Sequence, residues 1–167
     1  RGIRFKTRIN KELLCANNQF AVRAVEYGTV AVFADALGTN ELKIGETYTL
    51  NGKSYPAKIG VAYSLEEGIN EVFAETDQFI DFTGVLINIS ENNYLSDYAV
   101  RSYFKYYNAN GELTTVYSDT YRPSVYDVAK NAYSAKNKDG SFVANVGMKG
   151  NGPNEYGWFE YVFISSE

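Results

Sequence analysis

The side chains best suited to catalysis in this sequence are carboxylates gathered in one stretch, residues 65–81. They are Glu66, Glu67, Glu71, Glu75, Asp77 and Asp81. A pair of carboxylates can hydrolyse a glycosidic bond without histidine, provided that the acid of the pair has a raised pKa. Nothing in the flanking sequence sets one of these residues apart in that way. A solvated acidic loop is therefore the favoured interpretation, and a glycoside hydrolase is the least favoured function.

Histidine is absent from all 167 residues, and Cys15 is the single cysteine. Histidine is the commonest general base, so serine–histidine–aspartate and cysteine–histidine chemistry are excluded within this chain. The flanks of Cys15, ELLCANN, favour a small buried side chain over a nucleophile. We therefore expect that the chain is not an enzyme.

Oxygen ligands for calcium occur in the acidic stretch and again in NKDG, residues 137–140. Calcium prefers clustered carboxylate and carbonyl oxygens, but the D-x-[DN]-x-[DN]-G pattern of a calcium loop is absent. The segment GNG, residues 150–152, lacks the lysine and hydroxyl group of a phosphate-binding loop. The sequence thus predicts no cofactor, with a structural calcium ion as the alternative.

The segment YGWFEYVFI, residues 156–164, suggests recognition by stacked rings. Alternation along a strand assigns one set of side chains to the core: Phe159, Tyr161 and Phe163. The opposite set, which would face solvent, includes Tyr156, Trp158 and Glu160. Sugar rings pack on aromatic rings while neighbouring polar groups bond their hydroxyls. These three residues are a predicted glycan platform, and the alternative is that Trp158 belongs to the core.

Tyrosine is unusually frequent, with 15 residues, and asparagine and glycine are plentiful. Tyrosine and asparagine favour strands joined by tight turns, and they also suit polar, stacking interfaces. Tyr103, Lys105 and Tyr107 form a second row of this kind and are predicted to bind the same class of ligand. The alternative is an ordinary β-rich domain with structural tyrosines.

The net charge of −4 and the pI near 5 argue against nucleic acid, because phosphate binding needs a positive face. No run reaches the roughly 18 uninterrupted apolar residues that a membrane span requires. We therefore expect neither a nucleic-acid partner nor a membrane span.

Alternating apolar residues divide most of the chain into strands, among them GIRFKTRI, residues 20–34 and residues 79–90. Asn51-Gly52 predicts a type I′ hairpin turn, and NANG, residues 108–111, predicts a second hairpin. Gly28 inside a long strand predicts a bulge or a close backbone approach. The connection ADALGTNELKIG, residues 34–45, has room for a short helical turn.

One longer helix is predicted over about 124–135. Ser124 and Asp127 match a capping box, and an apolar stripe follows at helical spacing: Val125, Val128, Ala129, Ala132 and Tyr133. Residues 138–167 then contain a last pair of strands. The pattern predicts a single domain over residues 1–167, an all-β antiparallel sandwich with one packed helix, and a closed barrel is the alternative.

Several motifs occur in a fixed order: GIRF (2–5), YGTV (27–30), FTGVLINI (82–89), VRSYFKY (100–106) and YRPSVYDVA (121–129). In that order they resemble a β-rich module of large surface and secreted proteins from Gram-positive anaerobes, especially clostridia and ruminococci. The resemblance covers about residues 1–133 and departs from the module at Pro123.

The resemblance implies a setting rather than a reaction. Such modules lie beside glycoside hydrolases, carbohydrate-binding modules, dockerins and cell-wall anchors, which implies an extracellular or cell-surface location in a Gram-positive bacterium. It implies no catalytic residue, and we interpret Arg101 and Arg122 as structural arginines bound to backbone carbonyls or a carboxylate. The expected function is a non-catalytic module that binds a polysaccharide or cell-surface glycan, with other modules of the same polypeptide as neighbours. The alternative is a structural spacer or adhesin module without a small ligand.

Overall fold

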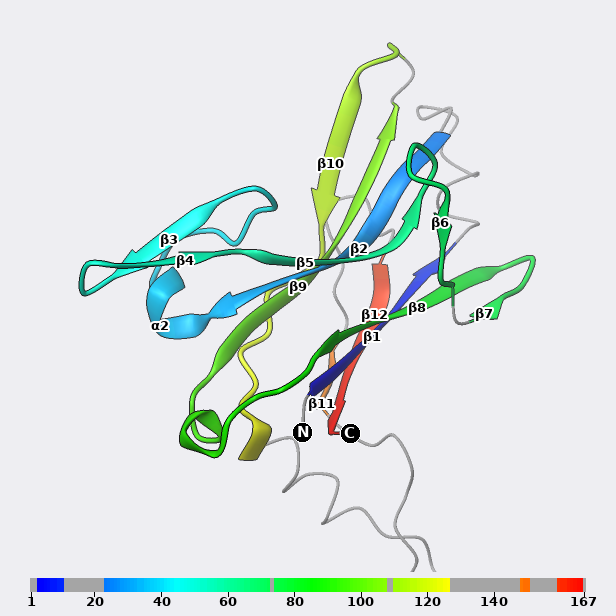
Figure 1. Cartoon of the computed structure of the whole chain (residues 1–167). Helices are drawn as coiled ribbons and strands as arrows, with labels where there is room; N and C mark the ends of the chain where they lie inside the picture. Colours follow the sequence, from blue (N-terminus) through cyan, green and yellow to red (C-terminus); the bar gives the residue numbers. More distant parts are fainter. Residues whose placement is uncertain are drawn as a thin grey trace, which may run out of the picture.

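The computed structural model describes residues 3–10, 23–72, 74–107, 110–126, 148–150 and 159–166. These residues form two antiparallel sheets and a hairpin (Figure 1). Sheet A has the order β11-β12-β1-β8-β7, with β1 (Ile3–Asn10), β7 (Ala74–Glu75), β8 (Phe79–Leu86), β11 (Met148–Gly150) and β12 (Phe159–Ser166). Sheet B has the order β10-β9-β2-β5-β6, with β2 (Arg23–Phe33), β5 (Lys58–Ser64), β6 (Ile69–Asn70), β9 (Tyr98–Tyr107) and β10 (Leu113–Tyr117). The predicted all-β antiparallel class is confirmed.

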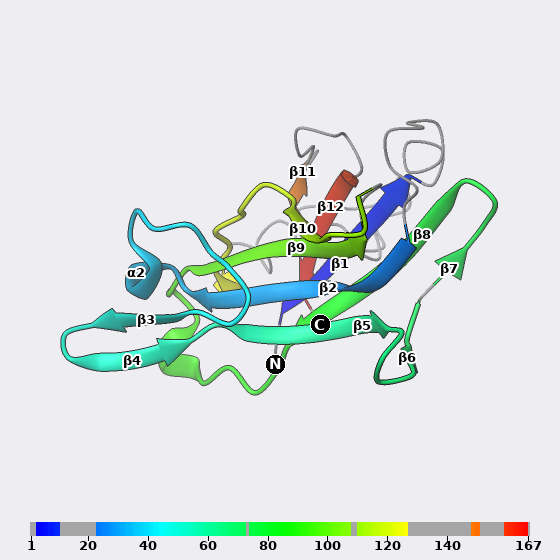
Figure 2. The ribbon, with the colours of Figure 1, turned by 90° about the horizontal axis from the view of Figure 1, so that it is seen from above.

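The main core lies between the two sheets, as in a sandwich (Figure 2). In β1 the alternation predicted from the sequence is present, because Ile3, Phe5 and Ile9 are buried while Arg4 and Lys6 are partly exposed. Opposite them lie buried residues of sheet B: Tyr27, Ala31, Val100, Phe104, Tyr106 and Val116. Burying these apolar faces from water is the main stabilisation of the sandwich.

A smaller layer covers one end of the outer face of sheet B. It consists of α2 (Ala34–Leu37), the connection after it, and the hairpin of β3 (Thr47–Leu50) and β4 (Lys53–Pro56). Its buried residues Leu37, Leu42 and Tyr48 cluster with Val30 and Ala99 of sheet B. Strands β2 and β9 are therefore buried on both faces here. The short helical turn allowed for in the connection is α2.

Both predicted hairpins are confirmed. The β3–β4 turn has positive φ at Asn51 (50°) and Gly52 (77°), as a type I′ turn requires. Strands β9 and β10 pair antiparallel from Tyr107 and Leu113 onward. Near the C-terminus β11 pairs antiparallel with β12, and residues 138–147 of the predicted strand pair lie outside the described residues.

Gly28 shows both features predicted for it. The register between β2 and β5 shifts between Tyr27 and Gly28, and a Cβ at Gly28 would lie 2.1 Å from the carbonyl oxygen of Gly60. Gly84 of β8 marks a second close approach, this time between the sheets. A Cβ there would lie 1.9 Å from Oγ1 of Thr29.

One predicted strand is shorter in the structure, and one predicted helix lies mostly outside the described residues. The strand predicted over 79–90 was too long, since β8 ends at Leu86 and Asn88 has a φ of 59°. Of the helix predicted over 124–135, only residues 124–126 are described, and the remainder lies outside the described residues. Within that short part Val125 is buried against the sandwich core, as the predicted apolar stripe requires.

Candidate functional site

The predicted row on β9 is not a continuous exposed surface. Tyr103 is 0% exposed, and its hydroxyl donates a 2.7 Å hydrogen bond to Oε2 of Glu26. Lys105 Nζ lies 3.6 Å from the same carboxylate oxygen, and Tyr107 is 40% exposed. Burial raises the pKa of Tyr103, and the hydrogen bond to Glu26 raises it further. The ring of Tyr103 is therefore closed off from solvent in this structure, and within the predicted row Tyr107 is the residue whose ring is exposed.

The second predicted platform is only partly within the described residues. Tyr156 and Trp158 lie outside them, and Glu160 is described only as backbone within β12. The register of β12 against β1 shifts near this point, with Ile9 opposite Phe159 and Arg8 opposite Tyr161. Strict alternation, on which the outward orientation of Trp158 was predicted, is therefore interrupted immediately after Trp158.

The acidic stretch separates into one structural carboxylate and several solvated ones. Asp81 is buried and accepts two hydrogen bonds from Arg8, at 2.7 and 3.0 Å. The Arg8 guanidinium also lies 4.5 Å from the ring centroid of Phe79. The other predicted carboxylates are exposed: Glu66, Glu67, Glu71, Glu75 and Asp77. Over the described ranges no three acidic, cysteine or histidine side chains gather to hold a metal ion, and residues 137–140 lie outside those ranges.

Both arginines singled out from the sequence bind backbone carbonyls, as predicted. Arg101 donates from Nε to the carbonyl of Ser118 (2.9 Å) and from a terminal nitrogen to that of Leu42 (3.1 Å). Its guanidinium also lies 4.3 Å from the ring centroid of Tyr117. Arg122 donates to the carbonyl of Gly38 at 2.9 Å, immediately after α2. These side chains hold loops in place and are committed to the fold.

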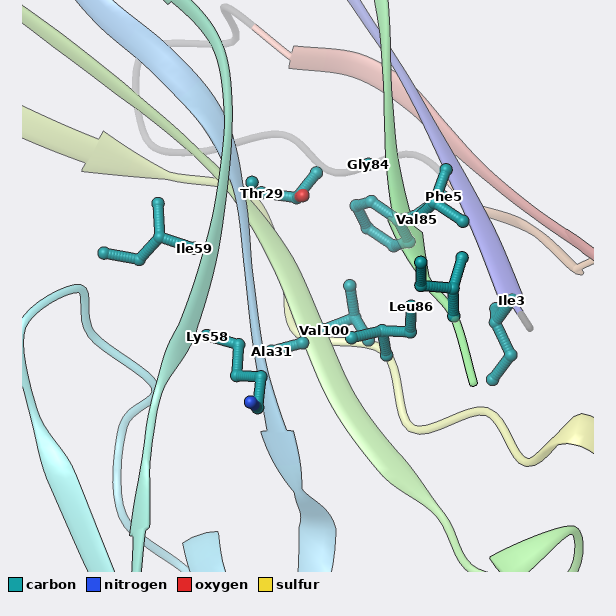
Figure 3. A pocket seen from close by; sticks show the side chains of 12 residues that line it. Ile3, Phe5, Thr29, Ala31, Lys58, Ile59, Gly84, Val85, Leu86 and Val100 are labelled. Carbon is teal, nitrogen blue, oxygen red and sulfur yellow. The ribbon is translucent and has the colours of Figure 1, made fainter. Parts of the chain in front are cut away.

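One concave site that the structure forms was not predicted from the sequence. It is a cleft of about 310 Å³ between the sheets, where β5 and β8 face each other (Figure 3). We call it the β5–β8 groove, and its lining residues are Ile3, Phe5, Thr29, Ala31, Lys58, Ile59, Gly60, Gly84, Val85, Leu86, Ile87 and Val100. A neighbouring hollow of about 110 Å³ shares Ala31, Lys58 and Leu86 with it. The lining is mainly apolar, and none of the described residues that form it is acidic.

Two strand edges border the groove. Strand β6 pairs with β5 only at Tyr63 and Ser64, and Glu71 donates from its backbone N–H to the carbonyl of Ala62. Strand β7 pairs with β8 only at Ile80 and Asp81. Among the strands that the structure describes, none pairs with the outer edge of β5 over 58–61 or with that of β8 over 82–86.

Sequence reasoning missed this site because strand pairing is not local. The residue pattern within 58–64, KIGVAYS, can indicate a strand but cannot show that half of its edge is open. Comparison of the chain with models of protein families, with curated proteins and with solved structures finds no match. In the described part of the chain no helix is long and apolar enough to span a membrane.

Proposed function

We propose that this chain is a non-catalytic association module of an extracellular bacterial protein, which joins protein segments rather than converting a substrate. The β5–β8 groove is the observation that carries the proposal. Exposed aliphatic side chains border the groove, with Val85 at 43% and Ile87 at 64% exposure, and Ile59, at 44%, lies on the opposite face of β5. Clustered exposed aliphatic residues beside a cleft are typical of protein interaction sites. The extracellular location rests on the resemblance of the sequence motifs.

The chemistry of the groove fits a polypeptide better than a sugar. Sugar sites combine exposed aromatic faces with several polar groups that bond the hydroxyls. Among the described residues that line the groove, the one aromatic residue, Phe5, is 2% exposed, and the polar side chains are those of Thr29 and Lys58. Apolar side chains of a partner protein would instead bury the rim from water.

Carbohydrate binding remains the second candidate, because one specific observation favours it. On the outer face of sheet B, Tyr107 is 40% exposed beside the Lys105–Glu26 ion pair, and Leu113 stands opposite Tyr107 at 55% exposure. This is a ring with a charged pair nearby, which is enough for one weak sugar contact.

Affinity electrophoresis separates the two candidates. The wild-type chain is run in gels containing starch, cellulose, xylan or mannan beside Tyr107→Ala and Trp158→Ala variants. The association function predicts no retardation of the wild type by any of these glycans. Retardation that either variant abolishes would support carbohydrate binding. Release of reducing sugar, lost when one acidic residue is replaced, would contradict a non-catalytic module.

A positive test uses a display library of random peptides selected on the immobilised chain. The proposal predicts enriched peptides whose binding is lost in Ile87→Asp, at the rim of the groove, and retained in Leu95→Asp. Leu95 is a matched control because it is 76% exposed and does not line the groove. Selection that yields only binders indifferent to Ile87→Asp would overturn the association function at this site.

A further inference from the structure

We infer that the β5–β8 groove accepts an extended peptide strand of a partner protein, which adds to the open edge of β5 at residues 58–61. The inference rests on the association function proposed above and names the class of partner. An unpaired edge presents backbone N–H and C=O groups in the spacing that another strand matches. Gly60, in the middle of this edge, is exposed and has no side chain to hinder the approach of a second backbone.

The protein already pairs its own chain with the other half of the same edges. Glu71 donates from its N–H to the carbonyl of Ala62 at 2.7 Å, next to the β5–β6 pairing at Tyr63. On the facing sheet β7 covers β8 at Ile80 and Asp81. Figure 1 shows β6 and β7 together at one end of β5 and β8, on the right of the view. A partner strand would continue this covering along the half of the sandwich that the groove leaves open.

The side chains around the groove define the side chains of the partner. In a strand added to β5, alternate residues would point between the sheets, toward the floor at Ala31 and Val100. Figure 3 shows these two residues between β5 and β8. The remaining residues would point to the opposite face of β5, where Figure 3 shows Ile59 directed away from the groove. Apolar residues at the inward positions, and an aliphatic residue beside Ile59, would therefore bury the most surface.

Lys58 adds a requirement of charge. It is exposed, it lines both the groove and the adjoining hollow, and no ion pair of Lys58 occurs among the residues that the structure describes. A carboxylate at the end of the partner strand nearest Lys58 would complement it. Two copies of this chain paired through β5 would instead bring two Lys58 side chains to one short ladder. The charge thus favours an acidic partner strand over a second copy.

The test uses the whole chain and synthetic peptides of about six residues, a usual strand length. The first peptide alternates valine and threonine and ends in aspartate. A second peptide carries lysine in place of the aspartate, and a third carries N-methyl groups at alternate positions, which remove the ladder hydrogen bonds and keep the side chains. Fluorescence anisotropy should show binding of the first peptide, weaker binding of the second and none of the third.

Hydrogen exchange identifies the edge that is used. Binding of the first peptide should slow exchange of backbone amides within residues 58–61. Protection confined to residues 82–86 would overturn addition to β5, as would binding of the N-methylated peptide with unchanged affinity. In either case the association function would stand, because a peptide still binds the groove. Binding of no peptide, together with no binder from the display library, would remove both proposals.

Paired variants test the contribution of charge. Lys58→Glu should weaken binding of the aspartate peptide about threefold to tenfold, as expected for loss and reversal of one exposed ion pair. It should improve binding of the lysine peptide. Lys43→Glu is the matched control, since Lys43 is exposed and lies outside the groove. Equal effects of the two variants would overturn the role of Lys58.

Dimerisation of the wild type without peptide, lost in Ile87→Asp, would identify a second copy as the occupant instead.

Discussion

The hydroxyl of Tyr103 and the carboxylate of Glu26 form a 2.7 Å hydrogen bond on the outer face of sheet B. Lys105 lies 3.6 Å from the same carboxylate, so a phenol, an acid and an ammonium group form one linked cluster across β2 and β9. Tyr103 stands directly opposite Gly28 in the ladder. Tyr103 and Lys105 of β9, which the sequence predicted as ligand-binding residues, therefore link this strand to β2 through Glu26.

This bond predicts a loss of stability at alkaline pH. Burial, and then the bond to Glu26, raise the pKa of Tyr103 above its unfolded value of about 10. Below that pH both states keep the phenol protonated, so its contribution to stability is complete. As pH rises above about 10 only the unfolded state ionises, and the free energy of unfolding should fall by up to about 1.4 kcal/mol per pH unit for this group.

Urea unfolding of wild type and Tyr103→Phe between pH 8 and 11 checks this expectation. The variant should be less stable at pH 8 by about 1 kcal/mol, because a buried hydrogen bond is lost. Its alkaline slope should be shallower than that of the wild type by roughly one proton. Both proteins retain another such group, Tyr27, whose pKa is also raised by burial, so the variant keeps part of the alkaline slope. Identical slopes for the two proteins would show that Tyr103 ionises as freely in the folded state as in the unfolded one.

Because Gly84 lies against the side chain of Thr29, we expect Gly84→Ala to lower the stability and a second substitution, at Thr29, to restore part of it. Gly84→Ala would place a Cβ 1.9 Å from Oγ1 and 2.7 Å from Cγ2 of Thr29. Overpacking of this kind usually costs about 1–3 kcal/mol. Thr29→Ala removes these two atoms but keeps the Cβ of residue 29, which would still lie 2.8 Å away, so the double variant should recover part of the loss. Chemical denaturation of the two single variants and the double variant forms a double-mutant cycle that measures this coupling.

Gly28→Ala is the matched control for that cycle. Its Cβ would meet a backbone oxygen, that of Gly60, at 2.1 Å, and truncating a side chain cannot relieve that contact. Thr29→Ala should therefore not rescue Gly28→Ala. If the same truncation rescued both glycine variants equally, the clash at Gly84 would not be the cause of its destabilisation.

Sequence patterns predicted the features that depend on a few neighbouring residues. Asn51-Gly52 specifies its turn because both positions need positive φ, and the turn forms as predicted. Gly28 interrupts a β-branched run, and the structure has both the register shift and the close approach there. Arg101 and Arg122, in the motifs that carry the resemblance, are predicted to bind backbone carbonyls or a carboxylate, and both bind backbone carbonyls.

The errors arise where distant segments meet. Alternation showed that Tyr103 and Tyr107 share a face, but not that Glu26 of another strand closes over Tyr103. The layer of α2, β3 and β4 over sheet B, and the open edge at Lys58, depend on the order of strands in each sheet. Periodicity within one strand carries no information on that order. The candidate groove could be found only from the three-dimensional structure.

Arg101 should be difficult to replace, even by lysine. Its fork reaches the carbonyls of Ser118 and Leu42 together while its plane lies over Tyr117. Lysine keeps the charge but cannot reproduce this planar geometry. Arg101→Lys should lower the free energy of unfolding by about 1–3 kcal/mol, because buried carbonyls lose their donors. Hydrogen exchange should also accelerate in residues 38–46, and a variant with wild-type stability and exchange would show that Arg101 does not anchor this connection.

The last prediction concerns the attachment of residues 121–126 to the sandwich. Val125 is 7% exposed and packs in the cluster of Ile3, Phe5 and Val100, whereas its neighbour Tyr126 is 53% exposed. Val125→Asp would bury an unpaired charge and should cost more than about 3 kcal/mol. Tyr126→Asp introduces the same charge one residue later and should cost less than about 0.5 kcal/mol, as is usual at the surface. Thermal and urea unfolding of the two variants make the comparison. Equal, small effects would mean that this segment does not pack on the core, and that the apolar stripe beginning at Val125 serves contact with a partner instead.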